Sequence, residues 1–91
     1  MKLVELVKGK YPHKWTAIFD DGKHVSFGHA DYQDYTQHHD KERRMLYRIR
    51  HKKDLEVRNP ATPAYLAYYV LWGSSTSLQA NLETFKRRFH L

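Results

Sequence analysis

The sequence predicts a small α+β domain, in which an antiparallel sheet of two or three strands is followed by three helices. Three observations lead to this prediction: a hairpin pattern over residues 14–28, an apolar helical stretch over 64–71, and apolar residues at helical spacing near the end of the chain. The 91 residues contain no internal repeat and no linker, so we expect residues 1–91 to form one domain.

The strands are expected in the first third of the chain. Segment 3–7 is apolar and β-branched and precedes Gly9 and Pro12, which is typical of a strand that ends in a turn. The hairpin of residues 14–28 turns at Asp20-Asp21-Gly22, where glycine can adopt the left-handed conformation.

Two registers of this hairpin are open. A two-residue loop pairs Ile18 with Val25, whereas a three-residue loop pairs Ala17 with Val25. We favour the three-residue loop because it gives the hairpin one apolar face, and a single buried face fixes a register. That face contains Trp15, Ala17, Phe19, Val25 and Phe27.

The first predicted helix runs from a cap at Thr36 to about Lys52. Its apolar residues Met45, Leu46 and Ile49 form one narrow stripe, and the rest of its surface is charged. Residues 55–61 are expected to form a loop.

Two more helices complete the predicted domain. Thr62 and Pro63 are a cap and a first-turn proline, and the helix that they open, Ala64–Leu71, is apolar on all sides. We expect this helix at the centre of the core, with its end at Gly73. A capping box at Thr76 begins the last helix, whose apolar stripe is Leu78, Leu82, Phe85 and Phe89.

The composition excludes several classes of function. The chain has no cysteine, which rules out disulfides, thiolate metal sites and thiol catalysis. No apolar run approaches the ~20 residues that span a membrane, so we expect no membrane partner. No catalytic motif is present, and we therefore expect no enzymatic activity, no cofactor and no small-molecule substrate.

Two weaker motifs have simpler explanations. His38 and His39 lack the spacing of a metal site, and a hydrolase would need them to converge with an acid in a pocket. Segment 73–77 could hold an anion at a helix N-terminus, but helix capping explains the same residues.

The net charge of +6 is concentrated in segment 41–53, which holds seven lysines and arginines against one acid, Glu42. Such a segment attracts the phosphates of double-stranded DNA without sequence preference, or it is a solvated face that nearby acids neutralise. Four of its cations recur every three or four residues and share one face: Lys41, Arg44, Arg48 and Lys52. The candidate nucleic-acid-binding residues are Lys41, Arg43, Arg44, Arg48, Arg50, Lys52, Lys53, Arg87 and Arg88.

Aromatic residues accompany these cations. Tyr32, Tyr35 and Tyr47 either stack on bases or serve as half-buried supports, and we favour the supporting role.

The alternative function is that of a dimeric scaffold whose cations meet acidic proteins. Segment 3–7 has apolar residues on both faces, and one face of the sheet is expected to stay open, which favours a two-fold dimer. The candidate dimer interface is Leu3, Val4, Leu6 and Ile18.

Much of the chain resembles a known family. The resemblance rests on Lys14-Trp15-Thr16-Ala17-Ile18-Phe19-Asp20-Asp21-Gly22-Lys23, Asp34-Tyr35-Thr36, Asn59-Pro60-Ala61-Thr62, Leu71-Trp72-Gly73 and Phe85-Lys86-Arg87-Arg88-Phe89. In this order the segments resemble a family of short basic virion proteins of large double-stranded DNA viruses, and the chain is most similar to members from Marseillevirus-type viruses of amoebae. The resemblance implies a setting in the virus particle and the cytoplasmic virus factory, and it implies no catalytic residues. In that setting the acidic partners of the alternative scaffold are expected to be virion or host proteins.

Overall fold

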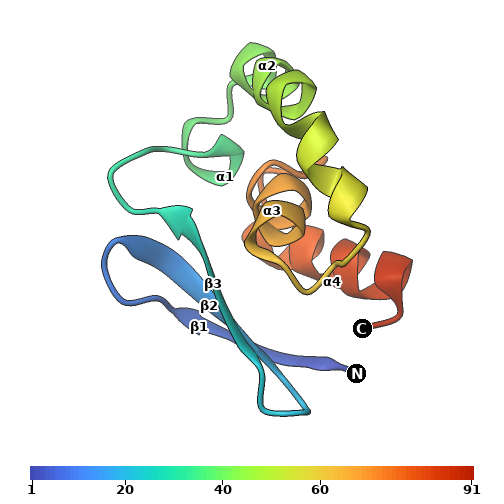
Figure 1. The fold of residues 1–91 in the computed structure, drawn as a ribbon. Coiled ribbons are helices and arrows are strands. Elements are labelled where there is room, and N and C mark those ends of the chain that lie inside the picture. Colours follow the sequence, from blue (N-terminus) through green and yellow to red (C-terminus); the bar gives the residue numbers. More distant parts are fainter.

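The computed structural model describes residues 1–91, and it confirms the predicted α+β class. The sheet has three antiparallel strands in the order of the chain: β1 (Leu3–Lys8), β2 (His13–Phe19) and β3 (His24–His29). All the helices follow the sheet in the chain and lie on one side of it (Figure 1).

The hairpin adopts the three-residue loop that the apolar pattern predicts. Ala17 lies opposite Val25, and the amide of Phe19 donates to the carbonyl oxygen of Lys23 at 2.9 Å. Gly22 has a φ of +88°, the left-handed conformation that this turn requires. The predicted apolar face points to the helices, and four of its five members are buried: Ala17, Phe19, Val25 and Phe27.

Strand β1 contains a bulge that the alternating pattern did not reveal. Leu3 lies opposite Phe19 and Glu5 lies opposite Ile18, so Val4 is the extra residue. The bulge turns Leu3 and Leu6 to the same side, where Leu3 is only 2% exposed and Leu6 packs against the core. The prediction that Leu3 reaches a dimer partner is therefore wrong, because the monomer already covers it. Of the other predicted interface residues, Leu6 and Ile18 are partly buried and Val4 is 57% exposed.

The predicted helix of residues 36–52 is interrupted. It consists of a short helix α1 (Tyr35–His38) and a longer helix α2 (Lys41–His51), and a 3-10 turn follows at Lys52–Val57. The caps explain the break: Asp34, in place of Thr36, caps α1, and Asp40 accepts hydrogen bonds from the first amides of α2. The 3-10 turn also occupies the first part of the predicted loop of residues 55–61.

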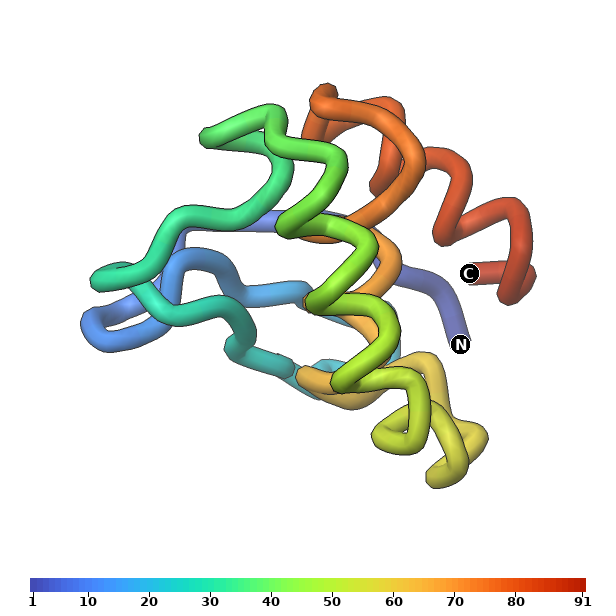
Figure 2. The backbone as a smooth tube through the Cα atoms, turned by 90° about the horizontal axis from the view of Figure 1, so that it is seen from above, coloured from blue at the N-terminus to red at the C-terminus, as the bar shows by residue number.

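The central helix is confirmed as the core of the domain. Thr62 caps α3 (Pro63–Leu66), which continues as a π-helical turn at Ala67–Leu71. The last helix, α4 (Leu78–Phe89), is capped by Ser77, one residue later than the sequence predicted. Seen from above, α2 crosses over the central helix, with α4 beside it (Figure 2).

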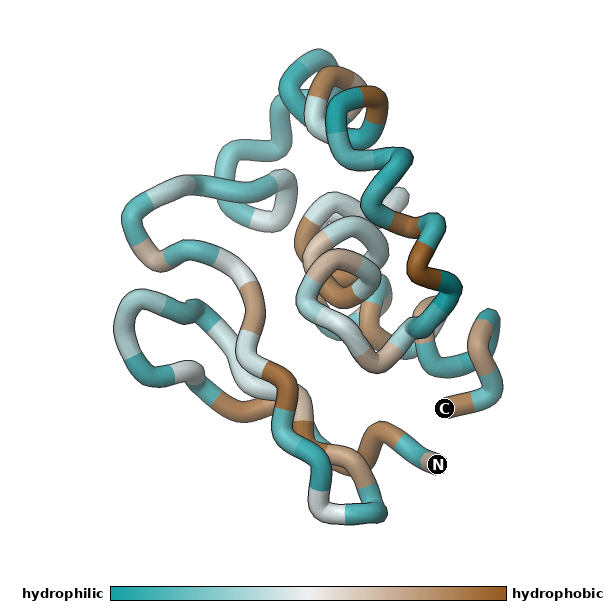
Figure 3. Tube along the Cα trace, viewed as in Figure 1, coloured by the Kyte–Doolittle hydropathy of each residue, from teal (hydrophilic) through white to brown (hydrophobic).

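The apolar stripe of α2 points to solvent and not to the core. Met45 is 53% exposed, Leu46 46% and Ile49 65%, and no residue of α2 is buried. In Figure 3 these hydrophobic positions interrupt the hydrophilic course of α2. An outward apolar stripe means that polar and aromatic side chains must attach α2 to the domain.

Candidate nucleic-acid interface

Two arginines of α2 attach this helix to the end of the central helix. Arg48 donates from Nη1 to the carbonyl oxygens of Tyr68 (3.1 Å) and Trp72 (2.7 Å). Arg44 donates from Nε to the carbonyl oxygen of Gly73 at 2.6 Å. The last carbonyls of a helix lack partners within the helix and carry partial negative charge, so two guanidinium groups satisfy them well.

Aromatic contacts complete this attachment. The ring of Tyr47 stacks on Trp72 with centroids 4.2 Å apart, and the ring of His51 stacks on Tyr47 at 4.1 Å. The guanidinium of Arg48 lies 4.0 Å from the ring of Tyr68. Burial raises the pKa of Tyr47 to about 12 and lowers the pKa of Arg48.

These contacts correct the predicted basic face. The face assigned to Lys41, Arg44, Arg48 and Lys52 does not present four free cations. Arg44 and Arg48 are half-buried and donate to main-chain carbonyls, so in this structure they anchor α2 and are not free cations.

The remaining cations are not neutralised by acids. Lys14 is the only one of the 16 lysines and arginines that lies within 4.0 Å of a carboxylate, that of Asp34. Two of the acids beside α2 have other partners: Asp40 caps the helix, and Asp54 lies 2.9 Å from His51. Glu42 and Glu56 are exposed, and Glu56 lines the hollow at the end of α2, but neither forms an ion pair with a lysine or an arginine.

Arg43 and Arg50 lie two turns apart on one side of α2, and both line a cleft of about 480 Å³ between α2 and the exit of β3. Arg50 also lines a shallower hollow of about 770 Å³ at the end of α2. The two concave surfaces share Arg50, so they adjoin each other at this side chain. We call the cations along them the cationic track: Arg43, Arg50, Lys52, Lys53 and Arg58.

The other predicted cations lie off this track. Lys41 is exposed at the start of α2 but lines neither the cleft nor the hollow. Arg88 lines a separate crevice with Arg44 and Arg48, where its guanidinium lies 5.3 Å from the ring of Tyr69. Arg87 is exposed on α4 and lines neither the cleft nor the hollow.

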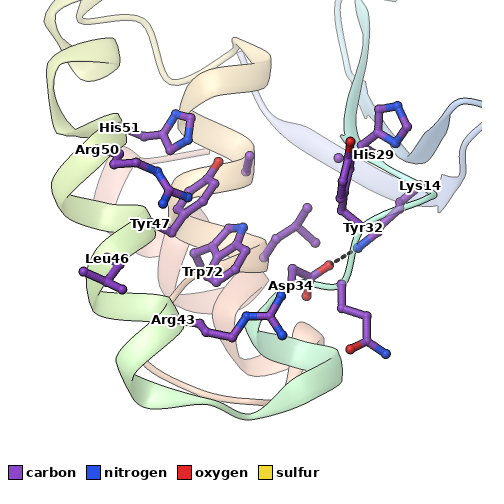
Figure 4. Close-up of a pocket in the computed structure, with 14 residues that line it drawn as sticks. Lys14, His29, Tyr32, Asp34, Arg43, Leu46, Tyr47, Arg50, His51 and Trp72 are labelled. Carbon is purple, nitrogen blue, oxygen red and sulfur yellow. Dashed lines mark hydrogen bonds and ion pairs between the residues drawn. The ribbon is translucent and has the colours of Figure 1, made fainter.

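The cleft has a cationic wall, an aromatic floor and an opposite wall of mixed character (Figure 4). Arg43, Arg50 and His51 project from α2 on one side, and the edges of Tyr47 and Trp72 form the floor. The opposite wall contains Lys14 of β2, His29 at the end of β3, and Tyr32 and Asp34 from the segment after β3.

One acid, Asp34, lines the cleft, and Lys14 compensates its negative charge. The carboxylate of Asp34 lies 2.6 Å from Nζ of Lys14 and also accepts the amide of Thr36. Asp34 and its partner Lys14 therefore leave the positive charge of Arg43 and Arg50 unopposed in the cleft.

The three tyrosines have different roles. Tyr35 is buried and lies under the guanidinium of Arg44, and Tyr47 is covered by Trp72 and His51, so these two are supports. Tyr32 is 70% exposed and lines the cleft. Sequence reasoning could not separate Tyr32 from the others, and it missed Lys14, His29 and Arg58, because only the tertiary structure brings them to this surface.

The two weaker motifs of the sequence, segment 73–77 and the pair His38 and His39, do not form binding sites in the structure. The amides of Ser75 and Ser77 already donate to Asn81 and to Ser75 Oγ, so segment 73–77 is a cap and not an anion site. Neither His38 nor His39 lines the cleft, and no cluster of three or more histidines and acids is placed to hold a metal ion.

His38 has a defined role at the bend between α1 and α2. Its Nδ1 accepts the amide of Asp40 at 2.9 Å, and its ring packs 5.2 Å from that of Trp72. Burial, followed by the charge of Arg43, lowers the pKa of His38, although Asp40 and Asp34 oppose the shift.

Acid should therefore destabilise this protein through His38. Below about pH 6.5 the unfolded chain takes up a proton that folded His38 resists, so the free energy of unfolding falls as the pH drops through that range. In His38→Asn an amide oxygen can still accept the Asp40 amide but cannot titrate. We expect urea denaturation at pH 7 and pH 5 to show a smaller difference for His38→Asn than for the wild type; an equal difference would assign the pH dependence to other groups.

No helix of the structure combines the length and the apolar character needed to cross a membrane.

Of the comparisons with known proteins, only the one with protein families found a match. A model of a family of unknown function, DUF5754, matches residues 6–51, which include most of the sheet, α1, α2 and both walls of the cleft. No curated protein and no solved structure matches the chain. Since the matched segment covers half of its length, the chain belongs to this DUF5754 family of unknown function.

Proposed function

We propose that this protein is a non-enzymatic DNA-binding protein that holds phosphates without sequence preference along the cationic track. The observation that carries the proposal is that the cations of the track form no ion pair with a carboxylate and line two concave surfaces that meet at Arg50. Unpaired arginines and lysines attract the phosphate backbone through counterion release, which does not depend on base sequence.

The shape of the surface supports the same proposal. Arg43 and Arg50 are on rigid helix turns, and their side chains project into the cleft (Figure 4). Arg44 and Arg48 fix the position of α2 through main-chain carbonyls, so the helix presents its free cations from a firm base. Lys52, Lys53 and Arg58 extend the charge beyond the end of α2.

A titration of labelled duplex DNA at two ionic strengths tests the proposal. We expect binding at about 50 mM salt that weakens by at least tenfold at about 200 mM, because several phosphates are neutralised together. Two duplexes of different sequence should bind equally well. The proposal fails if no binding is detected at the lower salt concentration.

The scaffold function remains a second candidate, because α2 exposes Met45, Leu46 and Ile49. Exposed apolar residues that adjoin each other are typical of protein-binding surfaces. Since cations flank this stripe, an acidic protein suits it better than a second copy of the chain. Sedimentation equilibrium distinguishes these partners: a monomer at every concentration excludes the dimer, whereas a dimer that Ile49→Lys dissociates would place self-association on α2.

The resemblance to virion proteins of large DNA viruses indicates where the proposed DNA binding takes place. We propose that the protein is packaged in a virion and meets viral DNA there or in the virus factory of the host cytoplasm. Mass spectrometry of purified particles tests this placement, which is rejected if the protein is absent from them.

A further inference from the structure

The cleft contains more than phosphate binding requires. Cations alone would suffice for phosphate contacts, and the hollow at the end of α2 already supplies them. The cleft adds depth and an exposed aromatic ring, Tyr32, on the wall opposite Arg43 and Arg50 (Figure 4). This combination of a ring, two guanidinium groups and a partly enclosed volume needs its own explanation.

We propose that the cleft binds one unstacked base of a single-stranded nucleic acid, with Tyr32 as its stacking platform and Arg43 and Arg50 as the contacts to the flanking phosphates. This inference rests on the proposed function, and it adds that the preferred form of the ligand is a single strand. In duplex DNA the bases are paired and stacked, and they cannot enter a cleft of this kind without being extruded.

The ring of Tyr32 is available for this purpose. It is 70% exposed, and its neighbour His29 lies 4.9 Å away with the two rings tilted by 58°, which supports the tyrosine without covering it by parallel stacking. The other aromatic rings of the cleft are not available, because Tyr47 is stacked between Trp72 and His51. One base is therefore the number that this cleft can stack.

The size and the charge of the cleft agree with this ligand. Its volume of about 480 Å³ lies within the range of about 300–1,000 Å³ that is usual for ligand pockets. Its one acid, Asp34, is paired with Lys14, so Arg43 and Arg50 face the cleft unopposed. Guanidinium groups bind phosphate oxygens, and their planes also stack on bases, so both arginines suit a base with its flanking phosphates.

An exposed ring next to unpaired cations is the usual arrangement for binding single strands without sequence preference, because every base has a π-face. Arg50 lines both the cleft and the hollow, so the phosphates next to a base held in the cleft lie toward the end of α2, where Lys53 and Arg58 line the hollow. The cationic track then follows the backbone while the cleft holds a base.

The test compares oligothymidine with an abasic strand of the same length, which has the same phosphates and no bases, and with duplex DNA. Fluorescence anisotropy at low salt should show that the wild type binds oligothymidine roughly 5- to 150-fold more tightly than the abasic strand, the range expected for one stacked base. Tyr32→Leu should lose this difference and bind both strands equally. Tyr32→Trp should restore it, and its fluorescence should be quenched by oligothymidine.

Tyr11→Leu is the matched control, because Tyr11 is also an exposed tyrosine but does not line the cleft. This variant should bind like the wild type. Oligouridine in a parallel titration identifies which kind of strand is preferred, and tighter binding of either supports the inference.

Two failures are distinguishable. If the strands bind but Tyr32→Leu does not change the preference for bases, or if the abasic strand binds as tightly as oligothymidine, the base-binding cleft is wrong and phosphate binding stands. If no strand and no duplex binds at low salt, the proposed function itself is wrong.

Discussion

Replacing Arg43 and Arg50 together with glutamine should weaken DNA binding roughly tenfold to a hundredfold at low salt and leave the fold intact. Both side chains are exposed and make no hydrogen bond or ion pair within the protein, so their loss removes phosphate contacts and little else. The dependence of affinity on salt gives a second readout. The slope of log K against log salt should become shallower by about 1.4–1.8, the change expected when two phosphate contacts are lost.

A control variant separates local contact from net charge. Lys10 and Lys23 are exposed in the turns that join the strands and line neither the cleft nor the hollow, and their replacement with glutamine lowers the net charge by the same two units. We expect Lys10→Gln/Lys23→Gln to change affinity much less than the arginine pair does. Equal losses in the two double variants would show that the whole charge of the protein attracts DNA and that the cationic track is not the contact surface.

The parts of the fold that the sequence predicts correctly are those decided by neighbouring residues. The hairpin register follows from Gly22 and from alternating residues only a few positions apart. Thr62 and Pro63 open the central helix by local capping chemistry. The bulge at Val4 is different, because it depends on how β1 meets β2, and an apolar segment with residues on both faces does not show which residue is extra.

The orientation of α2 could not be predicted because its cause lies elsewhere in the chain. Periodicity places Met45, Leu46 and Ile49 on one side, and an apolar stripe ordinarily faces the core. In this protein the last carbonyls of the central helix need donors, and the arginines that reach them precede those carbonyls by 20 to 29 residues. That requirement turns Arg44 and Arg48 inward and the apolar stripe outward.

Only the cationic side of the candidate site could be predicted from the sequence. The sequence shows that segment 41–53 is basic and that Arg43 and Arg50 lie on a side of their own. It does not show that Tyr32 lies across from them, since the cleft is formed by packing α2 against the exit of β3. A run of cations indicates a binding surface, but the tertiary structure decides which of them are free.

Arg48→Met should destabilise the protein by about 2–4 kcal/mol, because two half-buried carbonyl oxygens lose a charged donor and the ring of Tyr68 loses its cation. Methionine retains an apolar chain of similar reach, so the loss reflects the guanidinium more than the packing volume. Urea denaturation at neutral pH measures the effect. Arg50→Met, in the same helix but facing the cleft, should stay within about 0.5 kcal/mol of the wild type.

Arg48→Met and Arg50→Met separate the two roles of α2, which are attachment to the central helix and contact with DNA. Under conditions where both variants are folded, Arg48→Met should keep the salt dependence of DNA binding, whereas Arg50→Met should make it shallower. The opposite pattern, with a stable Arg48→Met protein that has lost a phosphate contact, would mean that Arg48 leaves the carbonyls of Tyr68 and Trp72 to reach DNA. The attachment of α2 would then have to change on binding, and the cleft that α2 forms with the exit of β3 would have to change with it.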